Sequence, residues 1–293
     1  RALYGLKISP RRWYDTYRAY LESRGWTCCP AEPGLFRLRE MSMAVYVDDT
    51  LISGPDKAEI TKEMNEILKH FKGEEVLPKK VHKDGTEERD LLGSTLLYNQ
   101  KKKTMKIHMG DYIDKMVKKF NMEGCRKTAT PCAPYADLSS GKPDPEFPMR
   151  QLVGTLLWLS VMCRPDISFA CQRVAQFADK PNTAAVAAAK RIVKYCVHTR
   201  EQGISYSPEN EKAFRDTYQK VLDEHNKENP GDYSTLPDHV SFTDSDFAGD
   251  SIALRSTSGS TLCLLHRHSY RLVFKEAKHS RFVDRRSRIL WDV

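Results

Sequence analysis

The sequence lacks the features that mark membrane-spanning, secreted and zinc-binding proteins. No apolar run reaches the roughly 18 residues that a bilayer span requires, and the first residues contain no apolar signal segment. The eight cysteines form no Cys-x-x-Cys pair, and no histidine cluster has zinc-finger spacing. Only His266 and His268 near Cys263 leave a metal site of that kind open. We therefore expect free cysteines in a reducing compartment.

An initiating methionine and an internal repeat are absent too, and the composition is not that of a disordered chain. The first residue is Arg1, which leads us to expect a fragment or a processed segment. Hydrophobic residues make up 40% and charged residues 29% of the 293, enough for a core in two or more domains. The net charge of +8 fits a polyanionic partner such as nucleic acid, or simply a basic protein.

Hydrophobic periodicity predicts a mixture of helices and strands, an α+β chain. Residues 9–25 have Trp13, Tyr17 and Leu21 on one helical face, and residues 56–72 form a second amphipathic helix. Residues 73–90 are polar and predict a loop. A strand around "LLGSTLLYN" and a strand "KIHM" follow, joined by a basic tip at Lys101, Lys102 and Lys103.

The second half of the chain is more helical. Residues 111–120 predict a helix whose Lys115, Lys118 and Lys119 form either a phosphate-binding face or a solvated one. Residues 128–148 have a linker composition, and residues 149–198 predict further helices. Residues 207–238 predict a polar loop or an insertion, and a strand pattern returns at residue 239.

Two adjacent carboxylates, Asp48 and Asp49, interrupt the apolar stretch "MSMAVYVDDTLISG" of residues 41–54. The alternating pattern on both sides predicts a β-hairpin. A two-residue hairpin turn needs positive φ and usually has Asn-Gly or Asp-Gly, so Asp-Asp points to another purpose. Two adjacent acids repel each other unless a cation lies between them.

Carboxylates are the ligands that hard divalent cations prefer, and paired metals assist phosphoryl transfer in polymerases and nucleases. Consecutive residues point to opposite sides of an ideal strand, so a distorted turn and a third carboxylate would be needed. The alternative is a surface turn whose acids face water. A third hypothesis is an unrelated metal-dependent nuclease or phosphatase using Asp48, Asp49, Asp244 and Asp246.

A series of motifs, in order, resembles the reverse transcriptase and RNase H region of the Pol polyprotein of copia-type LTR retrotransposons. The motifs are "ALYGLKISPRRWY" (2–14), "YVDD" (46–49), "LLG" (91–93), "TATP" (128–131), "VGTLLWLSVMCRPDISFA" (153–170), "AAAKRIVKY" (187–195), "TDSDFAGD" (243–250) and "RSTSG" (255–259). The series covers nearly the whole chain, which makes the resemblance specific.

The resemblance implies a role for several residues. Asp48 and Asp49 would be two of the three catalytic carboxylates that bind Mg²⁺ or Mn²⁺, and Asp244 would be the first metal ligand of RNase H. The substrate-binding residues would be Tyr46 beside the primer end, Leu92 and Gly93 in a primer-grip hairpin, and Lys7. The partners would be a template-primer of RNA or DNA and a deoxynucleoside triphosphate, with no membrane. The location would be intracellular, in a cytoplasmic particle or the nucleus.

The sequence also departs from the family pattern. The strand with the family's first catalytic aspartate, and the fingers, would precede residue 1. Ile8 stands where the family usually has a glutamine that helps to hold the nucleotide. The last residues lack the glutamate of the family's RNase H helix, and Glu276, Asp284 and Asp292 are the only acids nearby.

These observations predict the following organisation. We expect a partial reverse transcriptase palm of antiparallel strands and helices (1–108), a helical region like a thumb or connection (109–206), a polar loop or insertion (207–238) and a truncated, RNase H-like α/β segment (239–293). The function would be RNA-directed DNA polymerisation by two-metal nucleotidyl transfer, with the isolated chain inactive because the first aspartate and the fingers are missing. The alternative is a catalytically dead remnant that still binds nucleic acid.

Overall fold

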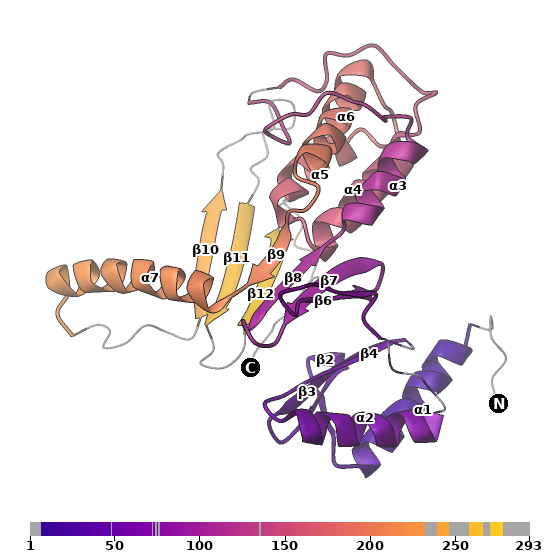
Figure 1. The fold of residues 1–293 in the computed structure, drawn as a ribbon. Helices are drawn as coiled ribbons and strands as arrows, with labels where there is room; N and C mark the ends of the chain where they lie inside the picture. Colours follow the sequence, from indigo (N-terminus) through magenta and orange to yellow (C-terminus); the bar gives the residue numbers. More distant parts are fainter. Residues whose placement is uncertain are drawn as a thin grey trace. The chain divides into compact units, whose positions relative to one another are not determined.

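The fold is described from a computed structural model (Figure 1). It describes residues 7–47, 49–71, 73, 75, 77–134, 136–231, 239–245, 258–265 and 270–277. The chain divides after residue 76 into two units, each of which is described by itself. Both combine helices with antiparallel sheets, so the predicted α+β class is confirmed.

The first unit is a four-stranded antiparallel sheet with two helices. The sheet order β1-β2-β3-β4 follows the chain. The strands are β1 (Thr27–Cys29), β2 (Glu32–Leu38), β3 (Met41–Tyr46) and β4 (Asp49–Ser53), and the helices are α1 (Ser9–Ser23) and α2 (Lys57–Phe71). Both helices were predicted within two residues of their ends.

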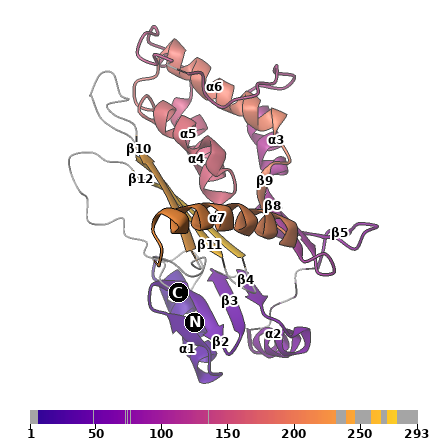
Figure 2. The ribbon, with the colours of Figure 1, turned by 90° about the vertical axis from the view of Figure 1, so that its left-hand side faces the viewer.

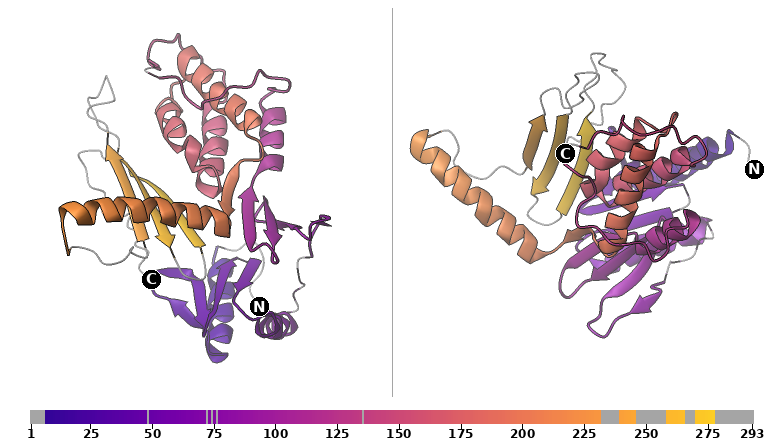
Figure 3. Two further views of the ribbon diagram at one scale, coloured as in Figure 1. Left: turned by 60° about the vertical axis from the view of Figure 1, so that its left-hand side comes forward. Right: turned by 90° about the horizontal axis from the view of Figure 1, so that it is seen from above.

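One face of this sheet forms the core with the two helices (Figure 3). Met41 and Met43 alternate along β3 and are 2% and 0% exposed. They belong to the same cluster as Leu21 of α1 and Ile67 of α2, so both helices pack on the face that these methionines share. The alternation predicted from the sequence thus selects which side of the hairpin is covered.

The second unit contains a five-stranded antiparallel sheet in the order β5-β6-β7-β8-β9. The strands are β5 (Lys80–Val81), β6 (Glu87–Leu91), β7 (Ser94–Asn99), β8 (Thr104–His108) and β9 (Gly203–Tyr206). The predicted loop over 73–90 is therefore wrong where β5 and β6 form. Their residues are too polar to show a strand pattern, and the conformation is determined by pairing, of β6 with β7 and of β5 with β6.

Helices follow β8 and lead back to β9. They are α3 (Gly110–Lys119), α4 (Met149–Met162), the 3₁₀ turn η1 (Pro165–Ile167), α5 (Ser168–Ala175) and α6 (Thr183–His198). Figure 2 shows α3, α4, α5 and α6 gathered together. They share a core in which Leu152, Leu156 and Leu159 of α4 are each 0% exposed. The predicted linker over 128–148 matches a stretch with no named element.

A buried arginine ties this helical region together. Arg164 is 0% exposed, and its guanidinium donates to both carboxylate oxygens of Asp166 at 2.9 and 2.8 Å. It also donates to the carbonyl and hydroxyl of Thr199 at 3.1 and 2.7 Å, and Tyr195 donates to Asp166 at 2.9 Å. The network therefore joins η1 to the end of α6 with the charge of Arg164 paired.

Of the two predictions for residues 207–238, a polar loop or an insertion, the loop is wrong over helix α7 (Pro208–Glu228). The helix begins with Ser207, whose hydroxyl accepts a hydrogen bond from the backbone of Asn210 at 3.1 Å, and Pro208 occupies its first turn. None of its residues is buried, so it has no strong apolar face of the kind that predicts a helix. Residues 232–238 lie outside the described residues.

A three-stranded antiparallel sheet is described near the end of the chain, yellow in Figure 3. Its strands are β10 (His239–Ser245), β11 (Ser258–Leu265) and β12 (Tyr270–Ala277). The strand pattern predicted from residue 239 is confirmed by β10. Elsewhere, the free cysteines expected from the sequence are found at Cys28, Cys29, Cys125, Cys132, Cys163 and Cys196. No helix among the described residues is long and apolar enough to cross a bilayer.

Candidate functional site

The "YVDD" stretch forms the end of the β3–β4 hairpin. Tyr46 pairs with Asp49, so only Val47 and residue 48 lie between the paired strands. Asp49 thus opens β4 and does not lie in the turn, a detail that the predicted Asp-Asp tip did not anticipate. Asp48 itself lies outside the described residues.

Val47 has a backbone conformation that β-branched residues rarely adopt. Its φ is +52°, in the left-handed region. A two-residue hairpin of either primed type requires a positive φ at this first central position, which explains the value. A valine in this region is strained by on the order of 1–3 kcal/mol, so surrounding contacts must hold the turn.

Helix α1 supplies these contacts. The indole N–H of Trp13 donates to the carbonyl oxygen of Val47 at 2.9 Å. One turn later, the hydroxyls of Tyr17 and Thr50 are 2.9 Å apart, so a second hydrogen bond joins α1 to β4. The Trp13 and Tyr17 rings stack at 5.6 Å, and Phe71 of α2 contacts both. We call Trp13, Tyr17 and Phe71 the aromatic brace.

The brace was missed by sequence reasoning, although one signal was present. Trp13 and Tyr17 were assigned to the apolar face of a helix, which is correct. Nothing in a helical period indicates that an indole N–H will reach a carbonyl 34 residues away. An aromatic residue with a polar group, four residues from a second one, is the signal that could have raised the question.

Tyr46 and Asp49 share the sheet face opposite the helices. Directly paired residues of antiparallel strands point to the same side, with Cβ atoms about 4.5–5.5 Å apart. Tyr46 is 58% exposed and Asp49 is exposed, in contrast to the buried Met41 and Met43 of the other face. The hairpin therefore presents a carboxylate and a phenol ring together, on a face that the described part of the unit leaves open.

This site has the donor chemistry of a hard-cation site. Asp49 has no ion-pair partner among the described residues of the chain, so its oxygens are available. Carboxylate oxygens suit Mg²⁺ and Mn²⁺. Within the described residues, which do not include Asp48, no group of three or more His, Cys, Asp or Glu could hold a metal. Asp49 fits a divalent cation as one ligand of a larger set.

The predicted residues Leu92 and Gly93 form a second tight turn, between β6 and β7 in the second unit. Their φ values are +53° and +76°, and Leu91 pairs with Ser94, which together define a two-residue turn of type I′. The carboxylate of Asp90 accepts a hydrogen bond from the Gly93 backbone at 3.2 Å. The ion pair with Lys79 lowers the pKa of Asp90, so this carboxylate stays charged.

Two predicted site residues remain, Lys7 and Asp244, and they lie far apart in the sequence. Lys7 is exposed and lies in the turn before α1, followed by Ile8, which is 51% exposed. Asp244 lies in β10 opposite Gly259 of β11, which in turn lies opposite Glu276 of β12. These three residues form one row across the sheet, and the other acids of interest, Asp246, Asp284 and Asp292, lie outside the described residues.

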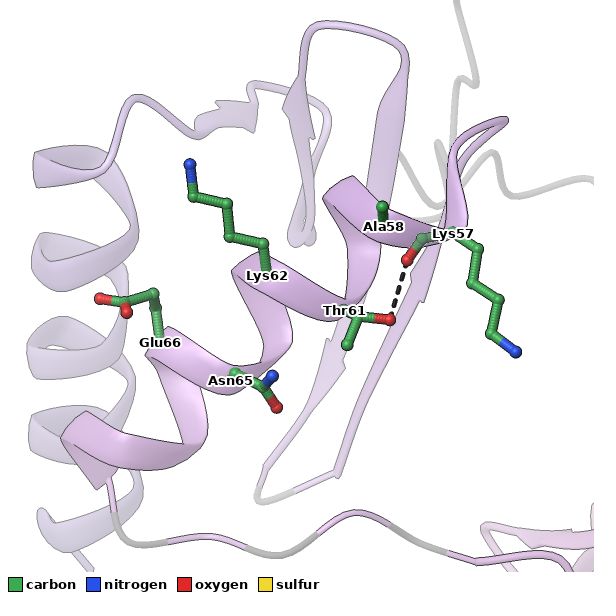
Figure 4. Close-up of a pocket in the computed structure, with 6 residues that line it drawn as sticks. All are labelled: Lys57, Ala58, Thr61, Lys62, Asn65 and Glu66. Carbon is green, nitrogen blue, oxygen red and sulfur yellow. Dashed lines mark hydrogen bonds between the residues drawn. The ribbon is translucent and has the colours of Figure 1, made fainter.

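A shallow depression on α2 offers no competing site. It is lined by Lys57, Ala58, Thr61, Lys62, Asn65 and Glu66 (Figure 4). All six residues belong to one helix, and Figure 4 shows their side chains spread along it without converging. The Thr61 hydroxyl donates to the Lys57 carbonyl of its own helix at 2.8 Å. The depression is therefore the solvent side of α2.

Comparison with known families finds a match over the first part of the chain. Residues 1–134 match the family described as reverse transcriptase (RNA-dependent DNA polymerase). No solved structure matches the chain.

Curated relatives extend the match over most of the chain. The retrovirus-related Pol polyproteins from transposons RE1 and RE2 of Arabidopsis thaliana are 31% and 30% identical, each over 91% of this chain. The Pol polyprotein from transposon TNT 1-94 of Nicotiana tabacum is 28% identical over 67% of it. The chain spans 16% of the length of each Arabidopsis relative and 15% of the Nicotiana one.

Proposed function

Because this chain is a reverse transcriptase region of a copia-type Pol polyprotein, we propose that its β3–β4 hairpin carries two ligands of a divalent-metal site for nucleotidyl transfer. The observation that carries the proposal is the hairpin geometry. A strained two-residue turn, fixed by Trp13, sets Asp49 beside Tyr46 on the sheet face that the described residues of the first unit leave open. Catalytic ligands need such rigid mounting.

In nucleotidyl transfer, the 3′ oxygen of a primer bonds to the α-phosphorus of a deoxynucleoside triphosphate and pyrophosphate leaves. Bound Mg²⁺ or Mn²⁺ would lower the pKa of the attacking hydroxyl and stabilise charge on the leaving oxygens. Asp48 and Asp49 would hold these ions, and Asp49 would do so from the first position of β4. Tyr46 would pack against the primer end on the same face.

The proposal assigns the rest of the site to other parts of Pol. By the family resemblance, a third carboxylate on a separate palm segment would complete the ligand set with Asp48 and Asp49. The family's fingers would supply contacts to the template and the nucleotide, and without them the isolated chain would be inactive in polymerisation. The substrates would be an RNA or DNA template-primer and a deoxynucleoside triphosphate. An intracellular location, in a particle or the nucleus, is part of the same proposal.

The finer division of the chain follows the family. The proposed palm covers 1–108, the thumb-like region 109–206 and the RNase H-like segment 239–293. The turn at Leu92 and Gly93 would be the primer grip, Lys7 would contact substrate, and Asp244 would be one ligand of an incomplete RNase H site. The RNase H-like assignment is supported by the antiparallel sheet β10-β11-β12, whose first strand contains Asp244.

The test is calorimetric titration of the full chain with Mg²⁺ and Mn²⁺. We expect binding that is lost in Asp48→Asn/Asp49→Asn. The matched control is Asp15→Asn/Asp56→Asn, which removes two carboxylates elsewhere in the first unit and should leave binding unchanged. Chain that binds should then support primer extension when the upstream palm and fingers are added in trans.

Other outcomes would reject parts of this proposal. Equal binding by the native chain and Asp48→Asn/Asp49→Asn would place the metal elsewhere. Absence of metal binding by the native chain would favour the alternative of a remnant that has lost the site. Ile8, which replaces the family's glutamine, fits the same alternative. Metal binding without any extension in the reconstituted system would separate an intact metal site from lost catalysis.

A further inference from the structure

Two hairpin turns at one end of the second unit's sheet carry a cluster of lysines. The β5–β6 turn spans residues 82–86 and the β7–β8 turn spans residues 100–103. The start of β6 lies beside the end of β7, because Glu87 pairs with Tyr98. Both turns therefore lie at the same end of the sheet, opposite the end with Leu92 and Gly93.

A buried asparagine joins the two turns. Asn99 is 1% exposed, and its amide nitrogen donates to the Asp84 carbonyl at 3.1 Å and the Thr86 hydroxyl at 3.0 Å. Its amide oxygen accepts from the Lys102 backbone at 2.9 Å. Since one side chain satisfies groups in both turns, the turns form a single unit. We call residues 82–86 and 100–103 the basic platform.

The platform has more positive charge than its own acids neutralise. Lys102 pairs with Asp84 at 2.7 Å, which adds a second link between the turns. Lys83, Lys101 and Lys103 are exposed, and none has an ion-pair partner among the described residues. Lys103 is also set in the left-handed region, with φ +52°. Three ammonium groups are thus held at one sheet end without internal counter-ions.

We propose that the basic platform binds the phosphate backbone of a nucleic-acid duplex, at a site separate from the β3–β4 hairpin. Lysines supply point charges for phosphates and carry no sequence information, so the contact would position the duplex without reading its bases. Fixed turns suit this purpose because little conformational entropy is lost when the duplex binds. The proposal deepens the proposed function and rests on it for the identity of the polyanion.

The experiment measures binding alone. Fluorescence anisotropy of the full chain with a labelled 20-base-pair RNA–DNA duplex is recorded at KCl concentrations from 50 to 200 mM, in EDTA and without nucleotides. The test variant is Lys83→Gln/Lys101→Gln/Lys103→Gln. The control variant, Lys212→Gln/Lys220→Gln/Lys227→Gln, removes the same charge from exposed positions of α7.

We expect the test variant to reduce the slope of log affinity against log salt by on the order of 2 to 3, about 0.9 for each lost phosphate contact. Its affinity at 100 mM KCl should fall at least about tenfold, while the control stays within about twofold of the native chain. A duplex of scrambled sequence should bind equally well. Circular dichroism confirms that each variant is folded.

Three results would overturn the inference. They are no duplex binding by the native chain at 50 mM KCl, an unchanged salt slope in the test variant, and an equal loss in the α7 control. The outcome is independent of the metal site, because EDTA is present. Normal metal binding with an unchanged salt slope therefore rejects the platform alone, and a platform effect without metal binding rejects the catalytic site alone.

Discussion

At the scale of a single residue, Val47 links the strain of the hairpin to its proposed use. Its positive φ is unfavourable for a β-branched side chain, and its 58% exposure means that little burial offsets the cost. The hydrogen bond from Trp13 to its carbonyl fixes the peptide that precedes Asp48. Because this hydrogen bond uses the backbone carbonyl, a residue that tolerates positive φ at position 47 would leave it in place.

This argument predicts that Val47→Asn stabilises the chain. Asparagine tolerates the left-handed region, so the free energy of unfolding of the first unit should rise by about 1 kcal/mol. Urea unfolding followed by tryptophan fluorescence measures the change. The control is Val81→Asn, a substitution of another exposed valine, in β5, which has no positive φ and should not stabilise. A loss of stability in Val47→Asn would contradict the strain.

At the scale of elements, His108 marks the junction of β8, β9 and α3. It is 6% exposed and lies at the end of β8, paired with Gly203. Its ring Nδ1 accepts a hydrogen bond from the backbone of Gly110, at the start of α3, at 3.3 Å. Burial lowers the pKa of His108, opposed by the carboxylate of Glu201, 3.5 Å from Nε2. The neutral ring is therefore the form that fits the junction.

The pH dependence follows from the direction of this shift. The unfolded chain takes up the proton of His108 near its ordinary pKa of about 6.5, whereas the folded chain takes it up only at lower pH. Stability should therefore fall as pH decreases below about 6.5 and be unaffected by this group above about 7.5. The groups that face the ring are Lys106, Asp111, Arg200 and Glu201.

The free energy of unfolding should fall less between pH 7.5 and pH 5.5 in His108→Gln than in the native chain. Urea unfolding at fixed salt measures this difference. His198→Gln, at an exposed position of α6, is the control and should keep the slope of the native chain. A slope that is the same in His108→Gln and the native chain would exclude His108 as its source.

The elements also show what could be predicted from the sequence. Helices α1 and α2 and strand β3 have clear apolar periods, which gave them their type and their buried face. Helix α7 was missed because none of its residues is buried, although the Ser-Pro pair at 207–208 is a helix start signal. Strand β6 was missed because Glu87–Leu91 shows no alternation and its pairing with β7 is a tertiary effect.

The candidate site divides in the same way. The hairpin itself follows from the apolar alternation on both sides of the two aspartates. The position of the turn does not, because Val47 is an improbable residue for a positive φ. The Asn99 bridge and the Trp13 hydrogen bond join residues that are 13 to 34 positions apart, and no periodic pattern encodes them.

At the scale of the whole molecule, the two units have separate hydrophobic cores. Met43, with 0% exposure, belongs to the cluster formed with Leu21 and Phe36 of the first unit. Leu156, also 0% exposed, belongs to the cluster of α3 to α6 in the second unit. Cooperativity arises from shared packing, so each core should define its own unfolding transition.

Scanning calorimetry of the full chain should therefore resolve two transitions. Met43→Ala and Leu156→Ala should each destabilise one unit by about 2–5 kcal/mol, through lost burial and an unfilled cavity, and leave the other transition in place. Each variant is the control for the other, because each removes a fully buried side chain of similar size. If both substitutions shifted one common transition, the two units would unfold as one, and strain at the hairpin would then be opposed by the stability of the whole chain.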